Sequence, residues 1–334
     1  MTETRPPPID LALLTLAVVA VSTSAPLVRV AEAPTLSIAF WRNGLALPVT
    51  VAAVIVGRRR GEPGLRDLSP EARRRSLAAG LFLAGHFATW VPSLSFTSVA
   101  SSVTLVSSTP IWAALLARHR GRPVARSTWQ GIGLALGGVV LLTGVDLTVT
   151  PRALFGDALA LAGGILAAFY LEAGAEVRRQ ASTAVYVTVC YSVAAAALLA
   201  VCLVGRQPLA GYDGETWLVL GALTLGPQLL GHTVLNRVLR TTSPTLVSVA
   251  ILGEILGAAF LAWVFFGEVP PAAALPAGVL LLTGVVVVVR AGGSAGPPVS
   301  VGAGSHGDER QHQHDDRQDE QGRRDDPADA AGLN

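Results

Sequence analysis

Residues 231–268 read GHTVLNRVLRTTSPTLVSVAILGEILGAAFLAWVFFGE. Within this stretch, residues 243–266 are almost entirely apolar, and a helix needs about 20 such residues to cross a bilayer. Two arginines, Arg237 and Arg240, stand just before the run, and one carboxyl group, Glu254, lies near its middle. The stretch therefore predicts a membrane-spanning helix with a basic flank and an acid close to the bilayer midplane.

The rest of the chain follows the same pattern. Of its 334 residues, 51% are hydrophobic and only 14% are charged, whereas soluble domains devote about a quarter of their residues to charge. Clusters of Gly, Pro and Arg divide the chain into ten apolar runs. The runs are residues 9–30, 36–57, 76–96, 98–117, 129–146, 154–173, 184–204, 216–236, 243–266 and 272–290. We therefore predict an all-α membrane protein with ten transmembrane helices.

Arginine supplies all 25 basic residues, and its distribution predicts the orientation of the spans. Basic residues that flank spans resist translocation and stay in the cytoplasm. With the N-terminus inside, 21 arginines lie on the cytoplasmic side, and the other side holds Arg29, Arg42, Arg152 and Arg206. The count predicts a multi-pass protein of the cell membrane, plasma or inner, with both termini in the cytoplasm.

The most basic loop, residues 58–75, favours lipid over nucleic acid as its partner. It has no aromatic side chain to stack on a base, and it carries Glu62, Asp67 and Glu71. We expect the lipid bilayer and a small-molecule substrate as partners, and no nucleic acid. Glycines at helix-packing spacing leave a homodimer open.

The spans form two similar halves. Five spans in each half is an odd number, which places the halves in opposite orientations. In the third span His86 precedes Trp90 by four residues, and in the eighth span His232 precedes Asn236 at the same spacing. We therefore predict two five-helix inverted-topology repeats. In chain order the divisions are a cytoplasmic N-terminal segment, the two repeats and a disordered cytoplasmic tail, at residues 1–8, 9–146, 147–290 and 291–334.

These patterns resemble the drug/metabolite transporter superfamily, and within it the EamA-type ten-helix transporters, over roughly residues 9–290. The most specific stretch runs from Gly231 to Thr245 and continues through Ile251-Leu252-Gly253-Glu254 to Phe265-Phe266-Gly267-Glu268. The first half matches at residues 93–100 and at Ser108-Thr109-Pro110-Ile111-Trp112, and Gly156-Asp157 matches at the start of the sixth span.

The resemblance implies carrier-type transport, often export, of amino acids, metabolites or drugs through a central cavity that opens to alternate sides. We accordingly expect a secondary transporter, favour export and leave proton coupling open. The chain departs from the family pattern at the end of the fourth span, where Gly121-Arg122 stands in place of the common Gly-Glu pair. In the second half Gly267-Glu268 is intact, so its acid has no counterpart in the first half.

Ionisable residues inside spans are the first candidates for function, because they cost several kcal/mol unless they face a cavity or a partner. His86 and Glu254 lie near the middle of the third and ninth spans, deeper by position than any other charged residue. His232 shares a helical face with Asn236. We hypothesise that Glu254 and His86 border the substrate cavity and that Glu254 changes protonation during transport. A packing hydrogen bond is the alternative role for Glu254, and for the histidines packing is as strongly favoured as function.

Weaker candidates for the cavity wall are Ser24, which lies beside the helix-breaking Pro26, the aromatic side chains of Trp90 and Trp112, and the fourth-span residues Thr109 and Pro110. Pro110 also predicts an irregularity in its helix, and Gly226-Pro227 predicts a kink in the eighth span.

Two pairs of residues are assigned to the membrane interface instead. Trp41 and Arg42 are typical of an interfacial anchor pair, with contact between Arg42 and an anionic substrate as the alternative. Glu172 and Glu176, where the sixth span leaves the membrane, predict a solvated cluster.

The sequence gives no indication of a cofactor. Cys190 and Cys202 are too far apart on one helix to bridge. The tail histidines His306, His312 and His314 have no spacing that imposes metal geometry, so a solvated tail is favoured and no metal site is assigned, with binding of a divalent metal as the alternative. The alternatives to a transporter are an intramembrane enzyme acting on lipid or isoprenoid precursors, for which no nucleophile and base are apparent, and a membrane scaffold or sensor.

Overall fold

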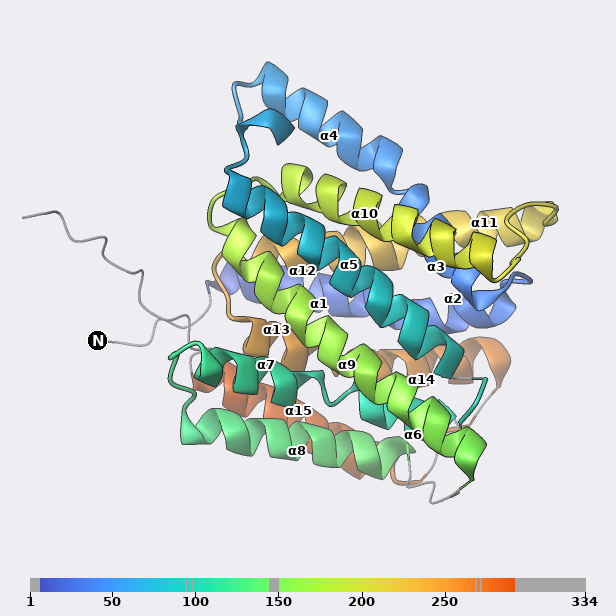
Figure 1. The fold of residues 1–334 in the computed structure, drawn as a ribbon. Helices are drawn as coiled ribbons and strands as arrows, with labels where there is room; N and C mark the ends of the chain where they lie inside the picture. Colours follow the sequence, from blue (N-terminus) through green and yellow to red (C-terminus); the bar gives the residue numbers. More distant parts are fainter. Residues whose placement is uncertain are drawn as a thin grey trace, which may run out of the picture. The chain divides into compact units, whose positions relative to one another are not determined.

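The computed structural model describes residues 7–93, 95–97, 99–143, 150–267, 269–270 and 272–291. Residues 1–295 form one compact unit, and every contact given below lies within it. The regular structure of the described part is entirely helical, with no strand (Figure 1). Ser98, Glu268 and the tail histidines lie outside the described residues, as does the whole chain from residue 292 onward.

Helices occupy all ten of the predicted runs. The first half contains α1 (Pro8–Ser22), α2 (Ser24–Val30), α3 (Thr35–Gly44), α4 (Leu47–Arg59), the short η1 (Leu65–Asp67), α5 (Pro70–Ser93), α6 (Val99–Val106), α7 (Thr109–His119) and α8 (Arg126–Thr143). The second half contains α9 (Pro151–Arg178), α10 (Thr183–Val204), α11 (Gly214–Leu223), η2 (Thr224–His232), α12 (Thr233–Val238), α13 (Pro244–Ile251), α14 (Glu254–Phe266) and α15 (Ala274–Arg290).

Six helical segments are long and apolar enough to cross a membrane by length and composition alone. They are Pro8–Val30, Thr35–Arg59, Pro151–Arg178, Thr183–Val204, Gly214–Val238 and Pro244–Phe266. The other four predicted spans are helical as well, but α15 has only 17 residues and α5 carries three consecutive arginines near its start. A membrane protein with several apolar helices is thus supported, and the number ten stays a prediction.

Four helices end four residues before a proline. The last residues of α1, α3, α6 and α11 are Ser22, Gly44, Val106 and Leu223, and the prolines that follow are Pro26, Pro48, Pro110 and Pro227. A proline lacks the N–H that would bond to the carbonyl four residues earlier, and its ring clashes with that carbonyl. The irregularity predicted from Pro110 is confirmed as the break between α6 and α7.

The eighth span changes helix type around its proline. The nine residues of η2 form a π-helix with Pro227 inside it, and the Thr233 N–H donates to the carbonyl of Gln228, five residues earlier. The irregularity predicted at Gly226-Pro227 is therefore confirmed, although as a π-helix. Such insertions redirect side chains and are frequent at functional sites.

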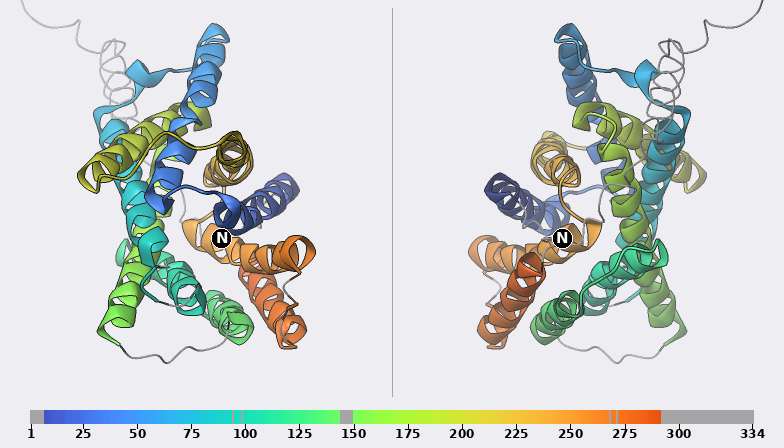
Figure 2. Two further views of the ribbon diagram at one scale, coloured as in Figure 1. Left: turned by 90° about the vertical axis from the view of Figure 1, so that its right-hand side faces the viewer. Right: turned by 90° about the vertical axis from the view of Figure 1, so that its left-hand side faces the viewer.

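Helix contacts repeat between the two halves. The third span, α5, packs on α9, and the eighth span, α11 with η2 and α12, packs mainly on α1, which is the counterpart of α9 in the first half. Three pairs of counterpart spans also pack on one another: α8 on α15, the fourth span on the ninth through α7 and α13, and α3 with α4 on α10 (Figures 1 and 2). This reciprocity fits two repeats of one design.

The α8–α15 crossing depends on glycine. A Cβ on Gly284 would lie 2.4 Å from the backbone nitrogen of Ala135, and one on Gly131 would lie 2.8 Å from the carbonyl oxygen of Gly284. Figure 2 shows the two helices side by side at one edge of the unit. Small residues at such a crossing let backbones approach closely.

The arginine-rich connections gather at one end of the described unit. The α4–α5, α7–α8 and α9–α10 connections lie at the left in Figure 1, and the α2–α3 and α10–α11 connections lie at the opposite end. The alternation agrees with the predicted orientation, and the cytoplasmic location of the arginine-rich end stays a prediction.

Candidate functional site

Two adjacent glycines of α9 bring several candidate residues together. The His86 Nδ1 and the Gly163 carbonyl oxygen lie 2.9 Å apart, and the Thr109 hydroxyl donates to the Gly164 carbonyl at 3.1 Å. A Cβ on Gly163 would lie 2.9 Å from the Cβ of Trp90. His86, Trp90 and Thr109 therefore gather around one point of α9, because glycine leaves room for α5 and α7 to approach it.

His86 is held in one tautomer at this point. A carbonyl oxygen only accepts, so Nδ1 carries the proton, and the Nε2 lone pair has no hydrogen-bond donor among the described residues. The ring stacks on Trp90 with centroids 5.6 Å apart and planes 16° apart. The hydrogen bond to the Gly163 backbone satisfies Nδ1, as a packing role requires. The lone pair of Nε2 stays available to accept a hydrogen bond from a ligand.

Trp112 belongs to the same region through a neighbour. Its Nε1–H donates to the hydroxyl of Ser108 at 3.0 Å. Ser108 also lies against Gly164, where a Cβ would come within 3.3 Å of its hydroxyl oxygen. The predicted fourth-span residues Thr109 and Trp112 thus lie around the glycine pair, and Pro110 is buried between them in the first turn of α7.

A second polar cluster surrounds Arg42 of α3. Its side chain is buried, with 4% of the residue exposed. Its Nε donates to Gln228 Oε1 at 2.9 Å and its Nη1 donates to the Ser24 hydroxyl at 3.3 Å. Gln228 in turn donates to Asn43 Oδ1 at 3.1 Å. The remaining nitrogen of Arg42, Nη2, is buried and has no hydrogen-bond partner.

Phe87 connects the Arg42 cluster with the histidines of both halves. The Arg42 guanidinium lies 4.8 Å from the centre of the Phe87 ring, and the His232 ring meets Phe87 edge-on at 6.1 Å. The His86 ring lies 5.1 Å from it. Arg42 interacts electrostatically with His86, His232 and Glu254. Residues of both repeats therefore meet around one buried aromatic ring.

Glu254 begins α14, immediately after the break that follows α13. Its side chain is half-buried and forms no hydrogen bond with the described residues. The two glycines that flank it contact α1: a Cβ on Gly257 would lie 2.2 Å from the Ser22 hydroxyl oxygen, and one on Gly253 would lie 3.2 Å from Val18. These glycines let α14 approach α1 closely.

The Asn236 side chain lies against α9 and makes no contact with the Arg42 cluster. Its side-chain Nδ2 donates to the Tyr170 hydroxyl at 2.6 Å and to the His232 carbonyl at 2.8 Å. The backbone carbonyl of Asn236 accepts from Arg178 Nε at 3.0 Å. These contacts join α12 to α9. Asn236 is placed among helix-packing bonds, and no contact joins it to Arg42 or Glu254.

The interfacial assignment of the Trp41–Arg42 pair is contradicted for Arg42 and stays a prediction for Trp41. The Trp41 indole N–H donates at 2.9 Å to the carbonyl of Leu209, in the α10–α11 connection. The Trp41 ring meets that of Trp217, in the first turn of α11, edge-on with centroids 4.9 Å apart. Arg42 points inward and is buried. The prediction that no other charged residue lies as deep as His86 and Glu254 was therefore wrong, because the Arg42 guanidinium lies over the ring of Phe87, the neighbour of His86.

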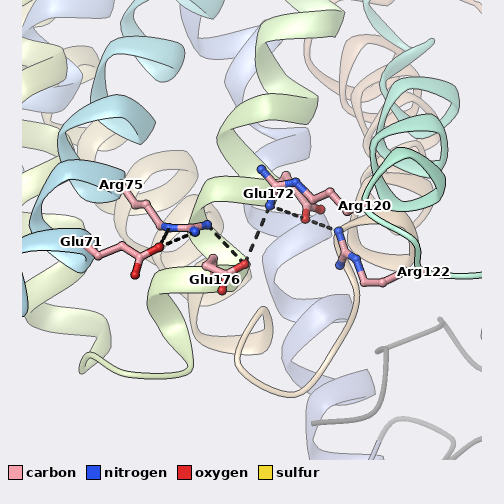
Figure 3. Close-up of polar contacts among 6 residues, drawn as sticks. All are labelled: Glu71, Arg75, Arg120, Arg122, Glu172 and Glu176. Carbon is pink, nitrogen blue, oxygen red and sulfur yellow. Dashed lines mark hydrogen bonds and ion pairs between the residues drawn. The ribbon is translucent and has the colours of Figure 1, made fainter. Parts of the chain in front are cut away.

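The solvated cluster predicted for Glu172 and Glu176 was wrong for Glu172. This side chain is 3% exposed and pairs with Arg120 at 3.0 Å and with Arg122 (Figure 3). Glu176 remains partly exposed and pairs with Arg75 at 3.3 Å. Arg75 also binds Glu71, and this hydrogen bond and charge lower the pKa of Glu71. The cluster joins α5, α9 and the α7–α8 connection.

Arg42 and Gln228 are the polar residues that sequence reasoning missed as parts of a central cluster. The available signal was a polar side chain in each of two apolar runs, with Gln228 directly after the helix-breaking Pro227. Within the described residues, no group of His, Cys, Asp and Glu side chains is arranged to hold a metal ion.

Comparisons with known proteins agree on family and fold. The family model of the EamA-like transporter family matches residues 9–144 and 154–290, one match for each half. A crystal structure of another protein superposes with a TM-score of 0.71 and 21% identity, over 84% of this chain and 96% of the other. At that identity the likeness concerns the fold alone. The search of curated proteins finds no match.

Proposed function

This chain belongs to the EamA-like transporter family, and from this membership we propose that it exports an amino acid, a small metabolite or a drug by alternating access. A general role in membrane transport follows from the family. Direction, substrate class and mechanism are the proposal.

One observation carries the proposal: ionisable side chains from both repeats contact the Phe87 ring, Arg42 and His86 from the first repeat and His232 from the second. Glu254, also of the second repeat, has no contact with that ring among the described residues and interacts with Arg42 through space. Polar groups at the interface of inverted repeats, beside discontinuous helices, are typical of the binding sites of secondary transporters. Rocking of one repeat against the other would expose such a site to alternate sides.

Glu254 is the residue that we propose for coupling to protons. It is half-buried inside an apolar run and has no hydrogen-bond partner among the described residues. An acid in such a place is costly when it serves only as a spacer. Its carboxyl group would bind and release a proton as the site changes from one side of the membrane to the other.

The test begins with an untargeted comparison of solutes. Cells with and without the protein are grown in one medium, and the extracellular small molecules are measured by mass spectrometry. Solutes that accumulate outside only with the protein are then loaded into liposomes that contain the purified full-length chain. Efflux that exceeds that of empty liposomes supports the proposal. If no solute differs in the medium and none crosses in liposomes, the proposal fails.

A further inference from the structure

The hydrogen bonds of Arg42 leave one edge of its guanidinium unused. Nε is bound by Gln228 and Nη1 by Ser24, both neutral groups, while Nη2 is buried with no partner. Guanidinium is always charged in proteins and offers its donors in a fixed plane. The edge between Nη1 and Nη2 is therefore held in position with the Nη2 donors unsatisfied.

The charge of Arg42 is also unpaired. No carboxylate lies within ion-pair distance of it in the part of the chain that the structure describes. Glu254 acts on it only through space. The Phe87 ring beneath it provides a cation–π contact, which is weaker than a charged hydrogen bond. A buried cation without an anion costs several kcal/mol, so a bound anion would stabilise this arrangement.

On this basis, which rests on the proposed transport function, we propose that Arg42 binds the carboxylate of a singly charged organic anion or zwitterion. The planar Nη1–Nη2 edge matches the two oxygens of a carboxylate. One fixed cation balances one negative charge. A doubly charged phosphate is therefore disfavoured. The Phe87 ring, with the His86 and His232 rings that lie against it, would face the apolar part of the molecule.

The site is shared by parts of the chain that lie far apart in sequence. Arg42 and Ser24 belong to the first repeat, while Gln228 lies in the π-helix of the second. Any motion of one repeat against the other changes the distance between Gln228 and Arg42. Gln228 is thus a positioning residue for the guanidinium, and carboxylate binding is coupled to the arrangement of the repeats.

The test measures thermal stabilisation of the purified full-length protein in detergent. The probes are the standard amino acids and the monocarboxylates from acetate to hexanoate, each beside its amide. Carboxylates that bind should raise the melting temperature, and their amides should not. In Arg42→Gln the apparent affinity for these carboxylates should fall at least about tenfold. Arg152→Gln, which removes an exposed arginine at the end of the molecule, should leave it unchanged.

Three results would overturn the inference: amides that stabilise as well as their acids, full carboxylate affinity in Arg42→Gln, or no stabilisation by any carboxylate. If Arg42→Gln does not fold, Arg42→Lys decides, because it keeps the charge and loses the planar fork. Weaker carboxylate binding in that variant supports the inference, and unchanged binding contradicts it.

Liposome transport separates this inference from the proposed function. If the protein moves only neutral or cationic solutes, and does so equally well in Arg42→Gln, the transport function is supported and the carboxylate site is contradicted. Arg42-dependent stabilisation by carboxylates without movement of any solute would support the site and contradict transport.

Discussion

Glu254 is the residue whose chemistry the proposed mechanism requires most. Replacing it with Gln keeps the shape of the side chain and removes its ability to release a proton. We expect Glu254→Gln to retain at least part of solute exchange across liposomes, and to lose the acceleration of net efflux that a pH gradient produces. The measurement is efflux of the identified solute with and without an imposed gradient.

A matched control for this variant is Glu215→Gln, which removes an exposed carboxyl group at the start of α11. Its efflux should depend on the gradient as that of the unmodified protein does. Gradient-driven efflux that persists in Glu254→Gln would exclude a proton role for this residue and leave it a packing residue.

Glu172 is expected to matter for stability. Its buried carboxylate is the common partner of Arg120 and Arg122, and removing one member of a buried ion pair leaves the other charges uncompensated. Arg120 is 39% exposed and can turn to water, so the cost is smaller than for a fully buried pair. We expect Glu172→Gln to lose about 2 kcal/mol of stability, measured by thermal unfolding in detergent.

Glu176→Gln is the comparison for that loss, because Glu176 lies one turn away and is 32% exposed. Ion pairs at exposed positions contribute less than about 1 kcal/mol. Equal melting temperatures for the two variants would show that the Glu172 pairs are as weak as surface pairs.

The positions of His86 and Glu254 were predicted by counting along their apolar runs. The same counting assigned Arg42 to the interface, because it cannot show that the side chain turns inward to Gln228 and Phe87. Glu172 was misplaced because the run ends at residue 173, whereas α9 continues to Arg178 and the α7–α8 arginines cover it. Counting positions along one apolar run does not reveal ion-pair partners that come from another segment, as Arg120 and Arg122 do for Glu172.

At the level of elements, the α8–α15 crossing gives the sharpest expectation. A methyl group on Gly284 would collide with the backbone of α8, which cannot move aside as a side chain can. We expect Gly284→Ala to cost about 1–3 kcal/mol, as overpacking does, and to lower the melting temperature. Gly133→Ala is the control, since a Cβ on Gly133 has no neighbour within 4 Å. Equal stability of both variants would mean that the helices do not touch there.

The start of α11 should respond to pH. The Asp213 side chain accepts from the Thr216 N–H at 2.7 Å, and this bond lowers the pKa of Asp213 below its ordinary value of 3.8. A lowered pKa means that the stabilisation is present above the ordinary pKa and is lost as the pH falls through the folded value. Amide hydrogen exchange at Thr216 should therefore be better protected with Asp213 than in Asp213→Asn near neutral pH, but not in acid. If the difference in exchange between the two proteins persisted in acid, the charge of Asp213 would not contribute to the hydrogen bond with Thr216.

Helix boundaries were largely predictable because their causes are local. Apolar length marks the spans, and the proline rule explains why helices end at Ser22, Gly44, Val106 and Leu223. The π-form of η2 was not predictable from Pro227 alone. It depends on which carbonyls the neighbouring helices satisfy, such as that of Gln228, which accepts from Tyr191 of α10 at 3.4 Å.

For the whole molecule, the two-repeat plan was predicted from a weak similarity between the halves, such as the equal spacing of His86 to Trp90 and of His232 to Asn236. The structure adds that the main inter-helix contacts have counterparts after exchange of the halves, as when α5 on α9 matches η2 on α1. The separation that relates His86 to His232 also relates Gly121 to Gly267 and so pairs Arg122 with Glu268. In the first half that position pairs with Glu172, a carboxylate that an acid in place of Arg122 would repel.

The inverted arrangement requires that each span reverse the direction of the chain, including the spans that are short or polar. Single cysteines at Arg66, Ser95, His119 and Arg152 bracket α5, the α6–α7 span and α8. The native Cys190 and Cys202 are buried and can be replaced first. An impermeant thiol reagent applied to intact cells should label cysteines at Ser95 and Arg152 and leave those at Arg66 and His119 unlabelled until the membrane is opened. If the cysteines at Arg66 and Ser95 reacted from the same side, α5 would not cross the membrane. The two halves would then share one orientation, and the reciprocal contacts between α5 and α9 would need another cause.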